Sequence, residues 1–319
     1  MKSLEIVLLA GCLCANSWGT PLVLANNSKV ADIDSYSHDA QNRSDRSTEQ
    51  AATPGVSDSA SPANESGRVS GLFWKWFRMG ERIQADEPDW LSPLATTSGR
   101  LKNEFRYDVF QQPMSPRGSQ YNFGGGKGLE FIVAPHIQLL VGPPPYVAHM
   151  GTTAPDGYAD IPVMVKVQLM SVGPREGNYL LTFFLSATVP GGSTSMRDPV
   201  LSPTIAFGKG WGNFDVQSTF GENLPAGDTA ALGRQLVENT AFQYRVLRRF
   251  WPAVEVNSQF FVAGKDAGET QVFLTPELGF GRIRLWRALK FSAAAGMQIA
   301  ATQFHTYNHR AVVSVRYSF

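Results

Sequence analysis

Apolar and polar residues alternate in short runs from residue 101 to the end of the chain, and clusters of Gly, Pro, Asn and Asp separate the runs. Alternation at every second position is typical of a β-strand with one apolar and one polar face. The run AVVSVRYSF at 311–319 shows it, because Val313, Val315, Tyr317 and Phe319 share one face. Twelve strands are predicted in this way, over residues 103–112, 122–134, 137–148, 160–172, 178–190, 200–209, 213–222, 234–247, 253–262, 270–280, 291–304 and 309–319.

The connections between these runs alternate between longer and shorter segments, with GRIRLWRALK and HTYN as the exceptions. Long loops on one side and tight turns on the other are typical of outer-membrane barrels, whereas a soluble β-sandwich explains neither regularity. Strands of about ten residues also suit a tilted crossing of the hydrocarbon layer. We therefore predict an all-β fold, a transmembrane antiparallel up-and-down β-barrel of about 12 strands, in contact with lipid in the outer membrane of a Gram-negative-type bacterium.

The residues before the barrel divide into three predicted segments. Residues 1–25 hold one Lys, an apolar run and a small-residue ending, which indicates an export signal peptide. Residues 26–70 are rich in Ser, Asn, Asp and Ala and predict a disordered linker. Residues 71–100 begin with GLFWKWFRMGERI, which predicts an amphipathic segment that lies on a surface or plugs the pore. The barrel is assigned to 101–319.

Charge and cysteine content narrow the chemistry. The formal net charge is +1 and no basic patch stands out, so nucleic acid is not expected as a partner. The two cysteines, Cys12 and Cys14, both fall within the predicted signal peptide. The mature chain would then carry no thiol for a disulfide or a metal. No cofactor is predicted.

Two features of the strands suggest functional residues. The aromatic residues Tyr317 and Phe319 end the last strand and resemble the carboxy-terminal signal that the outer-membrane assembly machinery recognises. The polar faces of the strands would line the lumen, where mixed charges either pair and close it or create a transverse field that selects polar solutes. This predicted lumen row consists of Glu104, Arg106, Asp108, Glu130, Lys166, Gln168, Asp215, Gln217, Gln243, Arg245, Glu255, Asn257, Gln259, Glu277, Gln298 and Arg316.

Three other constellations favour structural roles. His305 and His309 flank a predicted hairpin turn with no third ligand evident, so an exposed or cross-strand histidine pair is expected in place of a metal site. The stretch GGGKG at 124–128 does not fit the phosphate-loop pattern, because Gly128 follows the lysine. Ser258 and His149 could serve an outer-membrane hydrolase, but no nucleophile elbow surrounds Ser258.

Several blocks resemble an outer-membrane transporter family named for the MetA pathway of phenol degradation. They are GRLKNEFRYDVF, GGGKGLEFIVAPHIQLLVGPPPY, PTIAFGKGWGNFDVQSTFGENLP, WPAVEVNSQFF, QVFLTPELGFGRIRLW and QIAATQFHTYNHRAVVSVRYSF, in the family's order between about residues 90 and 319. The resemblance implies a barrel that passes small, often aromatic or hydrophobic molecules.

The function expected from these features is a passive channel or transporter for small molecules, with no enzymatic activity. The alternative is a non-transporting barrel with a closed lumen, which would serve as an envelope anchor or adhesion scaffold. An outer-membrane hydrolase is the less favoured third reading.

Overall fold

The computed structural model describes residues 63–114, 118–193, 198–286 and 289–319. They form two helices, α1 (Ala63–Asp86) and α2 (Thr229–Leu232), and fifteen strands. Neither described helix is long and apolar enough to cross a membrane. The strands are β1 (Glu104–Pro113), β2 (Ser119–Phe123), β3 (Leu129–Ala134), β4 (Ile137–Val141), β5 (Tyr146–Met150), β6 (Gly157–Tyr158), β7 (Ile161–Val172), β8 (Tyr179–Val189), β9 (Val200–Trp211), β10 (Phe214–Pro225), β11 (Arg234–Tyr244), β12 (Phe250–Ala263), β13 (Thr270–Trp286), β14 (Leu289–Ala300) and β15 (His309–Ser318).

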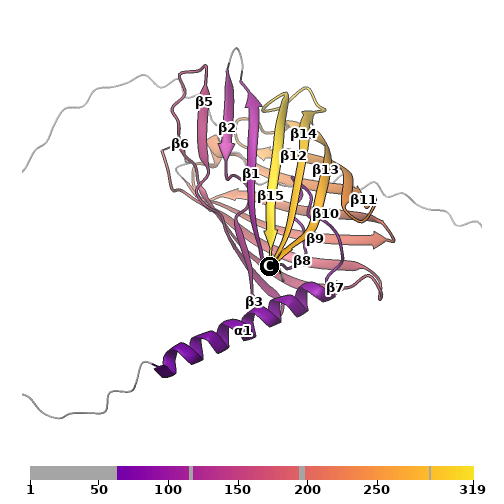
Figure 1. Cartoon of the computed structure of the whole chain (residues 1–319). Helices are drawn as coiled ribbons and strands as arrows, with labels where there is room; N and C mark the ends of the chain where they lie inside the picture. The colour runs from indigo at the N-terminus through magenta and orange to yellow at the C-terminus, as the bar shows by residue number, and fades with distance from the viewer. Residues whose placement is uncertain (1–62, 115–117, 194–197, 287–288) are drawn as a thin grey trace, which may run out of the picture. The chain divides into compact units, whose positions relative to one another are not determined.

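The sheet closes on itself through the first and last strands. Each strand from β7 to β15 pairs antiparallel with the next, and β7 continues through β4 and β3 to β1. Strand β1 then pairs with β15 from Glu104 opposite Ser318 to Gln111 opposite Ala311. The result is a closed antiparallel barrel of twelve strands, which Figure 1 shows with β1 and β15 side by side. The predicted fold class is confirmed.

Two of the predicted strands are interrupted. The run 122–134 becomes β2 and β3, and the run 137–148 becomes β4 and β5, whereas the run 160–172 is the continuous β7. The breaks lie at the Gly-rich residues 124–128 and at 142–145 with its three prolines. Gly124 and Gly126 have φ of 84° and 103°, a backbone conformation that glycine tolerates and strands do not use. Proline removes a ladder donor, so the same sequence that appears continuous by alternation cannot pair continuously.

Strand ends also differ from the prediction at one hairpin. Strand β13 runs to Trp286, past the predicted end at 280, and β14 stops at Ala300 where 304 was predicted. The connections GRIRLWRALK and HTYN, the two exceptions to the predicted alternation of longer and shorter connections, therefore no longer depart from it. Residues 281–286 are mostly strand, and the last connection spans 301–308. We call the end of the barrel that carries the β7–β8, β9–β10 and β11–β12 connections and the C-terminus the short-turn end.

The two faces of the barrel differ in polarity. Large apolar side chains such as Leu169, Leu185 and Leu278 are exposed on the outward face, while the inward positions hold buried polar and charged residues. Trp211 and Trp286 are exposed beside the short turns, as an interfacial aromatic belt requires. Trp251, near the same turns, is 1% exposed. It follows Phe250, which points outward against Phe280, so period-two alternation turns Trp251 inward.

The helix α1 begins at Ala63, before the boundary predicted at residue 70, because NESGRVS contains no proline to stop the helix before the amphipathic run. The rest of the predicted linker, 26–62, and the predicted signal peptide lie outside the described residues. The chain divides into two compact units, and the helix residues from Trp76 onward belong with the barrel. There Trp76 Nε1 donates to Ile132 O at 2.6 Å and Gln84 Nε2 donates to Phe319 O at 3.1 Å. In the other unit, Phe73 and Trp74 are exposed and stack edge to face.

Candidate functional site

An irregular segment, residues 87–103, occupies the interior of the barrel, and we call it the inner segment. It follows α1 and leads directly into β1, and its backbone forms neither helix nor strand. Thr96, Leu101 and Asn103 are completely buried. Because the segment is not part of a ladder, its backbone polar groups need partners from the side chains that surround it.

Two buried carboxylates bind the backbone of the inner segment. Glu255 on β12 accepts from Ala95 N at 2.7 Å and from Thr96 N at 2.5 Å. Glu277 on β13 accepts from Leu94 N at 2.8 Å. A carboxylate offers several lone pairs, so Glu255 satisfies two consecutive N–H groups that would otherwise be stranded.

Two buried arginines bind its carbonyl groups. Arg106 on β1 donates to Pro93 O at 2.9 Å and to Leu94 O at 2.6 Å, while its Nε pairs with Asp108. Arg316 on β15 donates to Pro93 O at 3.3 Å. Side chains from the neighbouring strands β1 and β15 therefore bind the same carbonyl group of the inner segment, Pro93 O, where the barrel closes.

A charge cluster holds the last third of the segment. Lys166 Nζ lies 3.0 Å from Glu130 and donates to Ser98 O at 3.1 Å. Lys102 of the inner segment lies 3.2 Å from the same Glu130 and also pairs with Glu104. All four side chains are nearly fully buried, so each charge depends on the others for compensation.

Glycines in the wall make room for the apolar side chains of the inner segment. A methyl group built on Gly208 would overlap the indole ring of Trp90, and one built on Gly279 would overlap Leu91. One on Gly296 would come 2.8 Å from Leu94 Cδ1. We call these three positions the glycine slots. Glycine within a strand often marks a close approach of this kind.

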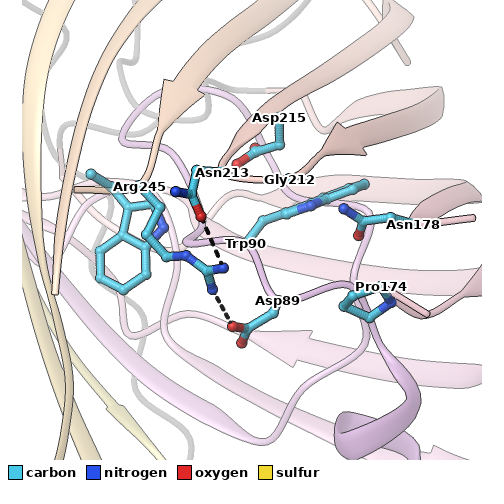
Figure 2. Close-up of a pocket in the computed structure, with 9 residues that line it drawn as sticks. Asp89, Trp90, Pro174, Asn178, Gly212, Asn213, Asp215 and Arg245 are labelled. Carbon is cyan, nitrogen blue, oxygen red and sulfur yellow. Dashed lines mark hydrogen bonds and ion pairs between the residues drawn. The ribbon is translucent and has the colours of Figure 1, made fainter. Parts of the chain in front are cut away.

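The short-turn end is fastened by ion pairs. Asp89 of the inner segment accepts from Arg245 at 2.6 Å (Figure 2). It also pairs with Arg282 on β13. Arg282 in addition donates to Trp90 O at 2.5 Å. Next to this, Glu87 accepts from Leu101 N at 3.1 Å and so joins the two ends of the inner segment. Burial raises the pKa of the Glu87 carboxyl.

The structure places the predicted lumen row on the inward face. All of its residues are buried except Arg245 and Gln259, which are partly exposed toward opposite ends of the barrel. Most of these residues form hydrogen bonds or ion pairs with the inner segment. They are Glu104, Arg106, Glu130, Lys166, Gln168, Gln217, Arg245, Glu255, Glu277 and Arg316. Others bond among themselves, as Asn257 does with Asn239 at 2.7 Å and Thr275 at 2.8 Å.

Sequence reasoning missed Lys102, Gln138, Arg282 and Arg310. Gln138 and Arg310 lie on inward strand positions. Arg282 lies at a β-bulge between Gly281 and Ile283 of β13, within residues that the alternation pattern assigned to a connection. Arg310 is enclosed between Phe110 and Tyr307, with its guanidinium 4.9 Å and 4.6 Å from the ring centroids.

The other constellations are structural where the described residues show them. His305 bonds to Thr302 O at 2.8 Å and to Asn308 Oδ1 at 2.7 Å, within the 301–308 connection. Ser258 on β12 neighbours β11 and β13, whereas His149 on β5 neighbours β2 and β6 and bonds to Pro155 O at 3.0 Å. The described residues contain no group of three His, Cys, Asp or Glu side chains that could hold a metal ion.

Comparison with known proteins supports the fold. No family model matches the chain. No curated protein matches it either. Among solved structures, an outer membrane channel from Pseudomonas putida F1 is similar with a TM-score of 0.51 at 11% identity, over 69% of this chain and 96% of that one. The KdgM porin is similar with a TM-score of 0.41 at 12% identity, over 67% of this chain and 99% of that one. The likeness to the Pseudomonas putida F1 channel shows a shared barrel fold, and the finer resemblance to the phenol-degradation family is not confirmed.

Proposed function

We propose that the chain is an outer-membrane channel for small solutes and that the inner segment closes it until that segment shifts. The observation that carries the proposal is the way the segment is held. Its backbone is bound by Glu255, Glu277, Arg106 and Arg316, and none of it is part of the barrel ladder. Displacing it therefore leaves the twelve-strand barrel intact, since water can replace side-chain partners one at a time.

The solved channel from Pseudomonas putida F1 supports the same function by its fold and its printed description. The sequence resemblance suggests that the solutes are small and aromatic or hydrophobic. Passage would be passive, through positioning and hydrogen bonding alone, with no cofactor and no covalent step.

A specific observation favours a second function, an anchoring barrel with a closed interior. Glu130 meets Lys102 and Lys166, and Arg106 meets Asp108, so these buried charges compensate one another within the closed state. If displacement of the inner segment left these charges buried and uncompensated, its free-energy cost would be too high for a channel that opens without an energy source.

A reversible disulfide between the inner segment and the barrel wall would distinguish the channel from the anchoring barrel. Leu91 Cδ2 would overlap a Cβ on Gly279, so cysteines at these two positions lie within the reach of a disulfide. The mature chain would carry no other thiol, since both native cysteines fall within the predicted signal peptide. We would measure entry of a small neutral solute into proteoliposomes that hold the Leu91→Cys/Gly279→Cys protein.

The channel predicts entry under reducing conditions and a loss of entry on oxidation, with the two single-cysteine variants unaffected by oxidant. The anchoring barrel predicts no entry in either state. Entry that is equal in the oxidised and reduced double variant would refute gating by the inner segment. Folding of every variant is checked by heat-modifiable gel migration.

A further inference from the structure

The turn between β11 and β12, at the short-turn end, has side chains that do not suit its backbone. Its two central residues, Leu247 and Arg248, have φ of 48° and 61°. Two successive positive φ values are the pattern of a type I′ turn, for which Asn and Gly are preferred. Arg249 N and Phe250 N both donate to Val246 O, at 3.2 Å and 3.0 Å, and fix this form. Strain of this kind indicates that a requirement other than the turn selects the side chains.

The same turn presents an apolar tip to its surroundings. Leu247 is 81% exposed, more than any other large apolar residue in the described part of the chain. On the adjoining hairpin of β13 and β14, Leu285 and Trp286 are exposed as well. The two hairpins are neighbours, because β12 pairs with β13 and Gly281 N donates to Arg249 O at 3.0 Å. We call their exposed ends the rim patch, which consists of Leu247, Arg248, Arg249, Arg284, Leu285, Trp286 and Lys290.

The rim patch is strongly basic. Arg248, Arg249, Arg284 and Lys290 are all exposed, and the patch contains no acidic residue. Within the described part of the chain, none of the three arginines forms an ion pair. Their charges are therefore available to an anion from outside the protein.

The exposed cations at the opposite end of the barrel differ in this respect. Arg234 pairs with Glu222, and Lys265 Nζ lies 3.8 Å from Asp266. Acidic neighbours thus compensate the positive charges there. Unpaired arginine is a property of the rim patch and not of the barrel's exposed surface in general.

The rim patch continues the lipid-facing surface of the wall. Phe250 packs against Phe280 with ring centroids 5.1 Å apart, and Tyr244 on the neighbouring strand β11 is 52% exposed. Aromatic side chains in such a row mark the depth of the lipid headgroups, and the short turns of an outer-membrane barrel face the periplasm. The rim patch would then lie among the headgroups of the periplasmic leaflet, which consists of phospholipid.

We propose that the rim patch binds the headgroup of an anionic phospholipid, with the arginines at its phosphate and Leu247 against the first carbons of its acyl chains. Arginine binds phosphate bidentately, and basic residues near a membrane surface add affinity for anionic lipid. The exposed Leu247, Leu285 and Trp286 favour a lipid over a soluble acidic protein, because only the lipid offers them an apolar surroundings. The inference goes beyond the proposed channel and does not depend on solute passage.

Tryptophan quenching by brominated lipid tests the proposal. The full mature chain is reconstituted in phosphatidylcholine bilayers that contain a small fraction of brominated lipid, with either a phosphatidylglycerol or a phosphatidylcholine headgroup. Bromine quenches a tryptophan that it contacts. The difference between the native chain and Trp286→Phe gives the signal of Trp286, and the ratio of quenching by the two lipids gives the enrichment of phosphatidylglycerol beside the rim patch.

We expect an enrichment of about fivefold or more beside Trp286, since one basic residue near the membrane surface contributes about that factor. Arg248→Gln/Arg249→Gln should lower the enrichment by about the same factor or more. Arg234→Gln/Lys265→Gln removes the same charge at the opposite end and should leave it unchanged. Equal quenching by the two lipids in the native chain, or equal losses in the two variants, would overturn the proposal.

Leu247→Asn/Arg248→Gly separates lipid binding from a structural role of the turn. Asn-Gly is the preferred sequence for a type I′ turn, so this variant should raise the temperature at which the folded barrel disappears on gels. It should also lower the enrichment of phosphatidylglycerol. A more stable variant that retains the full enrichment would overturn the proposal. Displacement of the brominated lipid by soluble polyglutamate would overturn it as well and would assign the rim patch to an acidic protein.

Discussion

Filling a glycine slot should loosen the inner segment. At Gly208, the atoms that a new methyl group would meet all belong to the indole ring of Trp90, the nearest being Cζ3. Trp90 is 4% exposed, so its ring is packed against the wall. Gly208→Ala therefore forces either local overpacking or the departure of Trp90.

The size of the effect follows from these two outcomes. Overpacking a well-packed site costs about 1–3 kcal/mol, and full loss of a buried Trp costs about 3–5 kcal/mol. We take the lower range, because the inner segment can shift slightly along its axis. At about 1.4 kcal/mol for a factor of ten, the displaced population should rise roughly 5-fold to 150-fold.

Hydrogen exchange measures this population directly. The amides of Leu94, Ala95 and Thr96 are protected by Glu277 and Glu255 only while the inner segment is in place, so their exchange should accelerate by that factor. Trp90→Ala should accelerate it as well. In the Trp90→Ala background, Gly208→Ala should add nothing, because the contact no longer exists. Unchanged amide exchange in the Gly208→Ala variant would refute the idea that Gly208 makes room for Trp90. An effect of Gly208→Ala that is equally large in the Trp90→Ala background would refute it as well.

Three further changes test other parts of the structure. Glu255→Gln should raise solute entry and speed exchange at the two amides that Glu255 binds by about tenfold, since hydrogen bonds to charged groups are the stronger ones, whereas Glu238→Gln on the neighbouring strand should change neither. Gly128→Ala should lower the yield of folded, heat-modifiable barrel, because its φ is 158° and the methyl group would come 2.5 Å from Gly142 Cα; a normal yield would contradict the close approach there. Deleting Phe319 should slow assembly in cells more than refolding in detergent, if the terminal residue acts mainly as a recognition signal; equal losses in both would assign it a purely structural role through its bond to Asn103 O.

The alternation of side chains predicted the barrel because each strand faces lipid on one side and the interior on the other. Strand β12 illustrates this, with Val254 exposed and Glu255 fully buried as neighbours. The same rule could not locate the breaks in the wall, since alternation continues on both sides of Gly128 while the backbone does not. Ladder pairing depends on φ and on available N–H groups, which the polarity pattern does not record.

The path of the inner segment could not be predicted from the sequence, for a related reason. Residues 87–103 have no periodicity, because their partners are side chains on many different strands. One local signal was present. Gly208 and Gly210 lie at successive inward positions of β9, where glycine weakens a strand unless another part of the chain needs the space.

The hydrogen bonds that hold the inner segment to the barrel wall have a consequence for selectivity. Glu255, Arg106 and Arg316 each bind the backbone of the inner segment. A solute that enters the barrel must therefore compete with a peptide for these groups. The inner segment thus acts as a tethered competitor at a high local concentration inside the barrel. Selectivity would then depend less on the width of the pore than on whether a solute binds these side chains as strongly as the backbone amide groups of the inner segment do.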